Sequence, residues 1–532
     1  MTFLKKHFDF ALACIAIAAF LLVACQRLGT VPVPDTDESY MLQTSYEMIN
    51  RGNLALPFRR LLGGNIETTW HSFTPLHYVI QSGFLKVFGW GLLQGRVFNL
   101  VMSSLMLVML YLIGRKLFGW QPGLIAVLLI VCDVTFLERS RYLRNDYSAA
   151  MFALLAFYVY EAAERRKNWR WYIGCGLAAG AALMTHTTGL YMVLAIPVLM
   201  LFRRGWRVFT TGSLYQYGLG AFAVSAYEII YDVIDYKNVV LQNRGDERHF
   251  GLLNAMGWWR NIRREPRRYY DWYHGGTMYS EVPRTLLHLF QLLALAGVCY
   301  LIVRFFVQLR RGNAINEPRV RVLMVTVIAV VFFTVVAGQK AIYYMAHLAP
   351  WFALCGAILV ADALSVRGRL RGGRVKAPKF AYAAALALAI AGALVVGWLG
   401  FKQTSHYLHA VRSPNNASFE DFKTAIRSFV PDGVCPVAVR EPVLWLAFPE
   451  HDLCFANIQL RTREAADIEG KEFVMIVAKQ DARYWVDEIA SKNHHLLGAL
   501  IDTPYGSYEV YYTGTDPRWQ ALKPREYTFF GR

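Results

Sequence analysis

The chain has 532 residues, of which 55% are hydrophobic and only 18% are charged. A soluble globular domain carries about 25% charged residues, so this composition excludes an ordinary soluble protein. The formal net charge of +18 would suggest a nucleic-acid partner for a soluble chain. Here, however, the apolar residues collect in runs of about 17–25, long enough to cross about 30 Å of hydrocarbon. We therefore predict a polytopic α-helical membrane protein with no nucleic-acid partner, because the runs are too long and alternate too little for barrel strands.

The apolar runs predict about eleven transmembrane helices. They lie at 8–27, 92–114, 118–136, 147–163, 169–186, 188–202, 213–234, 284–306, 320–338, 341–363 and 380–402. We accordingly divide the chain into a transmembrane domain, 1–402, and a polar C-terminal domain, 403–532. For the second we expect a small α/β fold, because "SFEDFKTAIRSFV" has helical apolar spacing and "KEFVMIVAKQ" and "GSYEVYYTG" have the composition of strands.

Basic residues predict the orientation in the membrane. With Lys5 and Lys6 in the cytoplasm, the cytoplasmic loops are "RKLFGWQ", "ERRKNWR", "RRGWR", "RRGNAINEPRVR" and "VRGRLRGGRVK". Every one is rich in Arg or Lys, as the positive-inside rule requires. An odd number of spans then leaves the C-terminal domain outside. We expect the inner (plasma) membrane of a bacterium, with the N-terminus in the cytoplasm and the C-terminal domain in the periplasm.

Two features of the cysteines stay open. "LLVACQ" (21–26) resembles a lipoprotein cleavage box, and cleavage before Cys25 would remove the first span, but a retained helix explains the same residues. Cys435 and Cys454 are the two cysteines of the C-terminal domain. An oxidising compartment favours a disulfide between them, which their spacing alone cannot establish.

The first outside segment, 28–91, begins with the acidic stretch "DTDESY" (35–40), close behind the first span. Asp37 and Glu38 stand there at the edge of the membrane, where acids are costly to desolvate and tend to mark functional sites. A solvated loop end would also tolerate them. Later in this segment, "SFTPLHYVIQSGFLKVFGWG" is apolar and aromatic but broken by proline, so we expect it to lie along the membrane interface.

A second outside loop holds "ERSRYLRNDYSAAMF" (138–152), in which arginines surround Asp146 at the start of the fourth span. Arg141 and Arg144 could bind a phosphate and hold the acid in place. The alternative is a plain helix N-terminus at which the helix dipole favours Asp146.

Two further outside segments carry cations. The segment 235–283 is rich in arginine and aromatic residues and includes Arg244 and His249. It is either an interfacial helix with snorkelling arginines or a surface for lipid-borne phosphates. In "GQKAIYYMAHLAPW" (338–351), Lys340 and Tyr344 are either ordinary interfacial anchors or ligands of a phosphate oxygen.

A lipid-linked phosphosugar is a substrate that fits acids and cations at a membrane surface. Its sugar leaves a polyprenyl phosphate, an already acidic leaving group whose charge Arg and Lys neutralise. A carboxylate base activates the acceptor. A pair of acids also stabilises the positive charge that develops on the sugar.

The chain resembles the GT-C superfamily of membrane glycosyltransferases, and within it the branch of protein O-mannosyltransferases and lipid A aminoarabinose transferases. The resemblance rests on Asp37-Glu38 after the first span, on "RSRYLRND" before the fourth and on "KAIYYMAHLAP" opening the tenth, and covers about residues 5–365. It implies the GT-C fold and an inverting transfer from a polyprenyl-phosphate sugar on the outer face. The acceptor would be a glycolipid such as lipid A, a polysaccharide or a protein, and membrane lipids are further partners.

The same resemblance implies the site residues. Asp37 would be the catalytic base, with Glu38 beside it, and Asp146 would be the second acid. The donor phosphate would be held by Arg141, Arg144, Lys340 and Tyr344. The lysine that relatives often carry before a Pro-Pro stretch is missing from "HSFTPLHY" (71–78), so Arg244, with His249 nearby, or another residue of 235–283 would take its place.

Some relatives bind a divalent metal, but no pair of outside histidines has ligand spacing. We assign no metal ligand and no certain cofactor, and a divalent metal remains an open alternative. The main alternative to an enzyme is a transporter or flippase of lipid-linked sugars, and another is a non-catalytic member that binds a partner through its C-terminal domain. We find no inverted repeat, and the charges gather at one face rather than at the bilayer centre, which favours the enzyme over the transporter.

Overall fold

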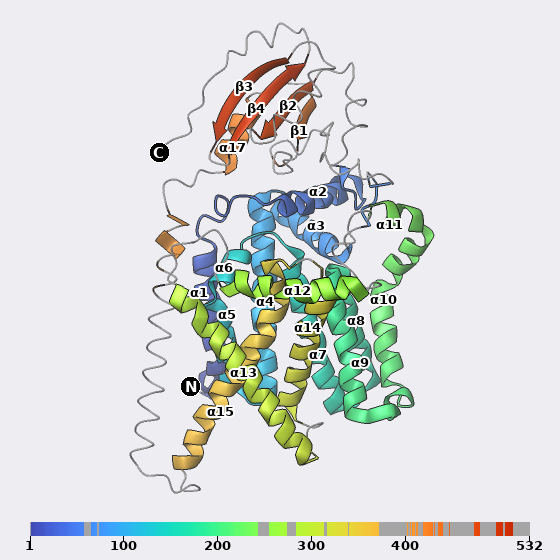
Figure 1. Ribbon diagram of the computed structural model, residues 1–532, viewed down its shortest axis with the longest axis vertical. Helices are drawn as coiled ribbons and strands as arrows, with labels where there is room; N and C mark the ends of the chain where they lie inside the picture. Colours follow the sequence, from blue (N-terminus) through green and yellow to red (C-terminus); the bar gives the residue numbers. More distant parts are fainter. Residues whose placement is uncertain are drawn as a thin grey trace.

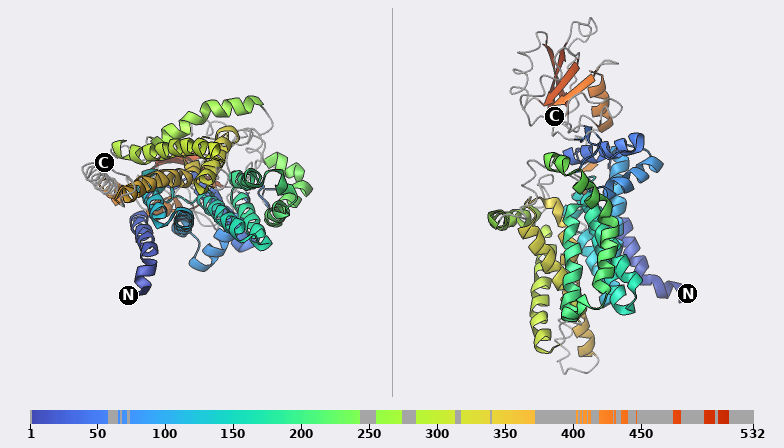
Figure 2. Two further views of the ribbon diagram at one scale, coloured as in Figure 1. Left: turned by 90° about the horizontal axis from the view of Figure 1, so that it is seen from below. Right: turned by 90° about the vertical axis from the view of Figure 1, so that its right-hand side faces the viewer.

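The computed structural model consists mainly of long helices that run side by side, with shorter helices across one end and a sheet beyond them (Figure 1, Figure 2). It describes residues 2–57, 65–66, 68–71, 74–242, 255–273, 284–312, 317–338 and 340–371. Beyond residue 371 it describes 402, 405, 407–409, 411–412, 419–428, 430, 435–439, 446, 473–478, 496–503 and 506–513.

Helices occupy every predicted span except 380–402, of which the structure describes only residue 402. They are α1 (Thr2–Ala24), α4 (Leu92–Phe118), α5 (Trp120–Val131), α7 (Asn145–Arg166), α8 (Trp169–Thr185), α9 (Leu190–Arg204), α10 (Ser213–Ile234), α13 (Arg284–Arg310), α14 (Pro318–Val335) and α15 (Met345–Arg371). In the described chain, the segments long and apolar enough to cross a membrane are Leu92–Phe118, Phe290–Arg310, Pro318–Val335 and Ile342–Ser365. A multi-pass membrane protein is thereby supported, whereas the number of eleven spans stays a prediction.

Helices α8 and α10 pack with their backbones almost in contact. A Cβ atom on Gly176 would lie 2.0 Å from the carbonyl oxygen of Tyr217, and one on Gly220 would lie 2.2 Å from that of Ile173. Only glycine fits at such distances, and small residues of this kind let membrane helices approach closely. The two helices are therefore fixed to each other through their backbones.

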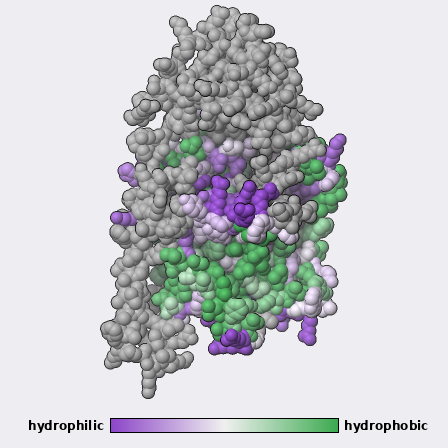
Figure 3. Space-filling model, in the orientation of Figure 1, coloured by the Kyte–Doolittle hydropathy of each residue, from purple (hydrophilic) through white to green (hydrophobic). Residues whose placement is uncertain are grey.

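The outer surface of the helices is apolar. Figure 3 shows a band of apolar side chains across the bundle, with polar side chains gathered above it over α12 (Ala255–Tyr273). Exposed apolar side chains of the long helices include Ile230, Val233, Leu295 and Val303. Helices that face hydrocarbon chains, with all their backbone bonds made internally, have this kind of surface.

Shorter helices lie at the polar end of the bundle. α2 (Thr36–Arg51) and α3 (Leu76–Phe88) cross this end (Figure 1). α2 begins with a capping box between Asp35 and Glu38, and α3 forms from the stretch that we expected along the interface. The other short elements are α6 (Val134–Arg139), η2 (Thr187–Gly189), η3 (Gly205–Phe209), α11 (Tyr236–Gln242), α12 and η6 (Ile342–Tyr344).

The described part of the C-terminal region includes a four-stranded sheet and the helix α17. The sheet has the order β1-β2-β4-β3 and consists of β1 (Cys435–Val439), β2 (Phe473–Ala478), β3 (Leu496–Thr503) and β4 (Gly506–Thr513). β1 and β2 are parallel and the other pairs antiparallel. Phe422 of α17 (Phe419–Arg427) packs against Tyr508 of β4, with ring centroids 5.9 Å apart. The division into domains 1–402 and 403–532 stays a prediction.

Candidate active site

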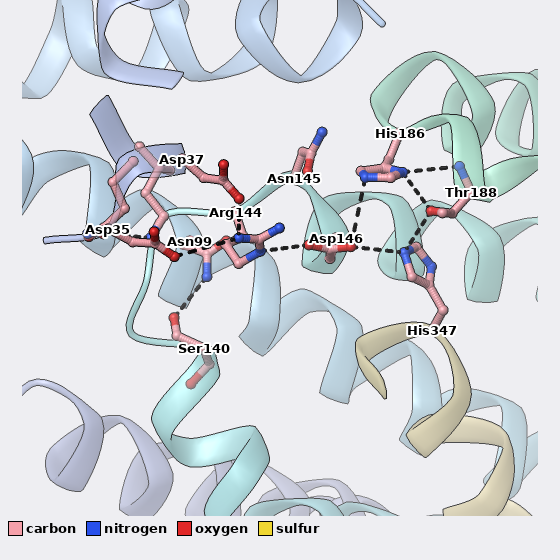
Figure 4. Close-up of polar contacts among 12 residues, drawn as sticks. Asp35, Asp37, Asn99, Ser140, Arg144, Asn145, Asp146, His186, Thr188 and His347 are labelled. Carbon is pink, nitrogen blue, oxygen red and sulfur yellow. Dashed lines mark hydrogen bonds and ion pairs between the residues drawn. The ribbon is translucent and has the colours of Figure 1, made fainter. Parts of the chain in front are cut away.

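Arg144 joins two of the acids that the sequence singled out. It precedes α7, and its guanidinium lies 2.7 Å from Asp37 of α2 and 2.9 Å from Asp146 of α7 (Figure 4). The same guanidinium lies over the ring of Tyr343, 3.5 Å from the centroid, which is a cation–π contact. Two segments far apart in the chain thus meet at one charged centre.

The two acids differ in their access to solvent. The side chain of Asp37 is 34% exposed, whereas that of Asp146 is fully buried. A buried carboxylate needs a charged or hydrogen-bonding partner, because an unpaired charge in the interior costs several kcal/mol. Arg144 provides that partner for Asp146 and leaves Asp37 open to a substrate.

The second oxygen of Asp146 faces two histidines. Oδ1 lies 3.4 Å from Nε2 of His347 and 3.9 Å from Nε2 of His186. The hydroxyl of Thr188 joins the two rings, at 2.6 Å from Nδ1 of His186 and 2.9 Å from Nε2 of His347 (Figure 4). The end of α8, the turn η2 and the start of α15 therefore all support the buried acid.

Sequence reasoning missed this group of side chains. It gave no role to His186, Thr188 or His347. The available signal was that 185–189 and 338–351 are predicted on the same side of the membrane as Asp146 and carry polar residues at the ends of apolar runs. Only the packing of α8 and α15 against α7 brings them together.

Asp146, His186 and His347 also form the one group that could hold a metal among the described residues, since their ligand atoms lie within 4.8 Å of one another. A carboxylate with two imidazoles suits zinc and related ions. However, the backbone N–H of Thr188 donates to Nδ1 of His186 at 3.0 Å. The neutral ring therefore carries its proton on Nε2, the nitrogen that faces Asp146, and a protonated nitrogen cannot bind a metal. In this arrangement the residues do not fit a metal ion.

Glu38 lies next to Asp37 in the chain but faces another part of the protein. Its carboxylate is fully buried and accepts two hydrogen bonds from Arg96 of α4, at 2.9 and 2.8 Å. It also accepts one from the backbone N–H of Leu143 at 2.8 Å. Both oxygens are occupied, so the geometry favours a positioning role for Glu38 over the catalytic role that we predicted.

Arg141 is likewise occupied by protein groups. It donates to the carbonyl oxygens of Gln26 and Val31 at 2.7 and 2.5 Å and to the hydroxyl of Tyr407. The side chain is buried, with 1% of its surface exposed. The geometry favours a role in fixing the segment after α1 over the predicted contact with a donor phosphate.

Lys340 makes three contacts within the protein. Its ammonium lies 2.8 Å from Glu265 of α12 and donates to the carbonyl oxygens of Phe333 and Thr334 at 2.8 and 2.9 Å. These contacts use all three of its N–H groups. Burial lowers the pKa of Lys340 to about 8, although the bond to Glu265 acts in the opposite direction. Here too the geometry favours anchoring, in this case of α12, over the predicted phosphate contact.

Tyr344 lies between this anchor and the acid centre. Its ring is edge-on to His186, with centroids 5.9 Å apart, and the Arg268 guanidinium lies 5.8 Å from its centroid. Asp37, Asp146 and Lys340 are thus linked through a series of contacts rather than by direct ones. The other predicted residues, Arg244, His249 and Cys454, together with the side chain of Cys435, lie outside what the structure describes.

Part of the chain matches a known family. Residues 72–231 match the family described as dolichyl-phosphate-mannose-protein mannosyltransferase. This stretch includes Arg144, Asp146 and His186 but not Asp37. An uncharacterized protein of Aquifex aeolicus (strain VF5) is 22% identical over 224 residues, which make up 42% of this chain and 44% of that protein. The match therefore spans less than half the length of this relative.

Solved structures share the fold over most of the chain. ArnT from Cupriavidus metallidurans, bound to undecaprenyl phosphate, superposes with a TM-score of 0.59 and 12% identity, covering 94% of this chain and 97% of that chain. The Archaeoglobus fulgidus oligosaccharyltransferase in its apo form gives 0.58 and 14%, covering 97% and 75%. The oligosaccharyltransferase AglB of the same organism, in complex with an inhibitory peptide and a dolichol-phosphate, gives 0.57 and 15%, covering 96% and 75%. The fold is that of the GT-C membrane glycosyltransferases, which confirms the resemblance seen in the sequence.

Proposed function

We propose that this chain is a glycosyltransferase that moves a hexose or pentose from a polyprenyl-phosphate donor to an acceptor outside the cytoplasm, with inversion at the anomeric carbon. The observation that carries the proposal is the Arg144 centre, which holds one accessible and one buried carboxylate at the polar end of the bundle. The fold supports it, because ArnT binds undecaprenyl phosphate and AglB binds dolichol-phosphate.

In this proposal Asp37 is the catalytic base. Its exposed side chain accepts the proton of an acceptor hydroxyl as that oxygen attacks the anomeric carbon. The bond from this carbon to the phosphate oxygen breaks, and the electron pair leaves with the polyprenyl phosphate. Asp146 stays ionised between Arg144 and the histidines, and its negative charge stabilises the positive charge that develops on the sugar.

The departing phosphate requires cations. Because Arg141 and Lys340 are occupied by protein groups, we assign the phosphate to Arg144, Tyr344 and the exposed arginines of α12. These arginines are Arg260, Arg263, Arg264 and Arg267. Several cations on the polar face of one interfacial helix suit the phosphate of a membrane lipid, and Figure 3 shows this polar surface directly above the apolar band.

The basic loops support a place in the bacterial inner membrane, with the N-terminus in the cytoplasm and the C-terminal domain in the periplasm. The acceptor would be a glycolipid such as lipid A, a polysaccharide or a protein. AglB in complex with an inhibitory peptide illustrates a peptide at this fold, and the choice for this chain depends on the shape of its pocket.

The direct test is transfer by the full-length chain in lipid nanodiscs, from a radiolabelled polyprenyl-phosphate sugar to extracted envelope glycolipids and glycoproteins. We expect Asp37→Asn to abolish transfer and to keep donor binding. Asp35→Asn is the matched control, because Asp35 lies 4.0 Å from Arg144 and is 42% exposed. Movement of the labelled donor across a vesicle membrane without product, unaffected by Asp37→Asn, would overturn the proposal in favour of a flippase.

Mass spectrometry of envelope glycolipids and glycoproteins is a second test, and it identifies the sugar and the acceptor. We expect glycolipids or glycoproteins from cells that lack the gene to lack one mass of hexose or pentose size. An unchanged set of glycolipid and glycoprotein masses would contradict a transferase.

A further inference from the structure

A cavity of about 450 Å³ lies where the first outside segment meets the outer end of α10. Its lining includes Trp70, His71, Tyr227, Glu228 and Tyr231, but none of the residues of the Arg144 centre. The size falls in the range of sites for small molecules, which are mostly apolar with a few convergent polar groups. Nothing in the reaction described above uses this cavity.

One wall of the cavity is a stack of three flat rings. Tyr227 and Tyr231 stand one helical turn apart on α10, with centroids 5.8 Å apart and an interplanar angle of 6°. His71 stacks on Tyr231 at 5.2 Å and 20°. Tyr227 is 66% exposed. A sugar ring presents a face of weakly positive C–H groups that packs on the negative face of an aromatic ring.

Two polar groups of the cavity can accept hydrogen bonds from a ligand. Glu228 lies between the two tyrosines in the chain, and the buried Oδ1 of Asn53 has no hydrogen-bond partner in the described part of the protein. The hydroxyl of Thr69 lies 3.2 Å from that of Tyr231. A ligand that offers several O–H or N–H donors, as a sugar does, would satisfy these acceptors.

The described charges around the cavity disfavour a phosphate. Among the lining residues that the structure describes there is no Lys or Arg. His71 is held between Asp232 and Asp235 at 3.2 and 2.9 Å, and these bonds raise its pKa although burial opposes the rise. Two aspartates face this one imidazole, so the local charge is negative. An anionic head group would be repelled here, in contrast to the arginine face of α12.

We propose that this cavity is the acceptor subsite and that it binds the sugar head group of a glycolipid without phosphate, which is neutral or carries an amine. This inference rests on the proposed function, because a bound sugar is an acceptor only if the chain is a glycosyltransferase. The sugar stacks on Tyr227, its hydroxyls bind Glu228 and Asn53, and its lipid chain lies against apolar side chains such as Ile230 on the outer face of α10.

The end of α8 borders both the cavity and the Arg144 centre. Met184 of α8 lines the cavity, and two residues later His186 faces Asp146. A sugar bound in the cavity is therefore separated from the buried acid by the end of one helix.

The experiment measures binding of octyl glucoside, a neutral sugar amphiphile, to the full-length chain in nanodiscs by saturation-transfer NMR, with octyl phosphate as the anionic comparison. We expect octyl glucoside to bind and octyl phosphate to be excluded from the cavity. Tyr227→Ala should weaken octyl glucoside binding about three- to tenfold, as the loss of one aromatic face predicts. Tyr215→Ala is the control, since Tyr215 is 64% exposed on the same helix and outside the cavity.

Glu228→Gln is the second variant, and it should let octyl phosphate compete for the cavity. The inference is wrong if Tyr227→Ala and Tyr215→Ala bind octyl glucoside equally well, or if octyl phosphate displaces it from the unmodified chain. Binding should also persist in Asp37→Asn. If the chain binds octyl glucoside through Tyr227 but never transfers a sugar, the sugar-binding site is retained and only the proposed transferase function is refuted.

Discussion

The rim of the site, formed by the first turn of α2, and its interior, formed by the start of α7, hold the same kind of side chain in opposite surroundings. Asp37 at the rim is about one third exposed and has one charged partner close by, Arg144. Asp146 in the interior is buried, with Arg144 at one oxygen and two histidines facing the other. One arginine therefore serves two carboxylates that differ in what they can do.

The two carboxylates therefore meet two different requirements, access to a substrate and a charge held in a fixed place. A base has to meet a substrate and accept its proton, which requires access, whereas a group that stabilises developing positive charge has to stay ionised in a fixed place. Asp37 has the access and Asp146 has the fixed environment. The following predictions test whether the two acids are divided in this way.

The largest effect is expected from Arg144→Met. The substitution leaves Asp146 buried without its cation, and breaking a buried pair in this way costs about 3–5 kcal/mol. Thermal unfolding in detergent measures the loss, and sugar transfer should disappear with it. Arg144→Met combined with Asp146→Asn should recover part of the stability, because the unpaired charge is gone. Equal melting temperatures for the single and double variants would contradict this account.

The two acids should respond differently to amidation. Asp146→Asn should cost about 1–3 kcal/mol of stability, because a buried acceptor is replaced by a group that also donates. Asp37→Asn should cost less than about 1 kcal/mol, as for other exposed ion pairs, while transfer falls about 10²- to 10⁴-fold. Thermal unfolding and turnover are measured for both variants. The proposed division of roles between Asp37 and Asp146 is wrong if Asp37→Asn is the more destabilising substitution.

A smaller effect is expected from Thr188→Val, which removes the hydroxyl between His186 and His347. One lost hydrogen bond should cost about 0.5–1.5 kcal/mol of stability and slow transfer by up to about tenfold. Donor affinity should not change, because Thr188 touches neither Asp37 nor the arginines of α12. Thr187→Val, at the half-buried neighbouring position, is the control, and a similar loss there would remove the special role of Thr188.

The smallest effect is expected from removal of metal ions. Because Nε2 of His186 carries a proton toward Asp146, we expect EDTA to leave both transfer and melting temperature unchanged. Inhibition by EDTA that zinc reverses would show that His186 turns its ring to bind a cation, and the interior of the site would then have a different chemistry.

The sequence predicted the helices well, because a span must be apolar over its whole length whatever its neighbours are. It also located Asp37 and Asp146, whose charges stand out at the ends of such runs. For Glu38 the geometry favours a positioning role, because adjacent residues on a helix point about 100° apart, so that Asp37 faces Arg144 and Glu38 faces Arg96. Arg96 lies inside an apolar run and gave no sign of its partner.

The histidines and the cations show a second limit. His186 and His347 come from separate turns, and only the packing of three helices makes them neighbours. Lys340 and Arg141 carry the charge that a phosphate needs, but most of their N–H groups are used by protein oxygens that the sequence cannot place. The sequence shows which residues are charged, whereas the fold decides whether a charged group can still bind a substrate.

The glycine contact between α8 and α10 has a consequence for selectivity. α8 ends at Thr185, next to His186 beside the buried acid, and α10 carries the aromatic wall of the cavity that we propose for the acceptor. The backbone contact at Gly176 and Gly220 therefore fixes the distance between the two. A distance set by contact between two helix backbones does not change to suit a ligand. Acceptors would then be selected by the distance between the sugar bound in the cavity and the hydroxyl that reacts. A larger residue at either glycine would change which hydroxyl receives the sugar.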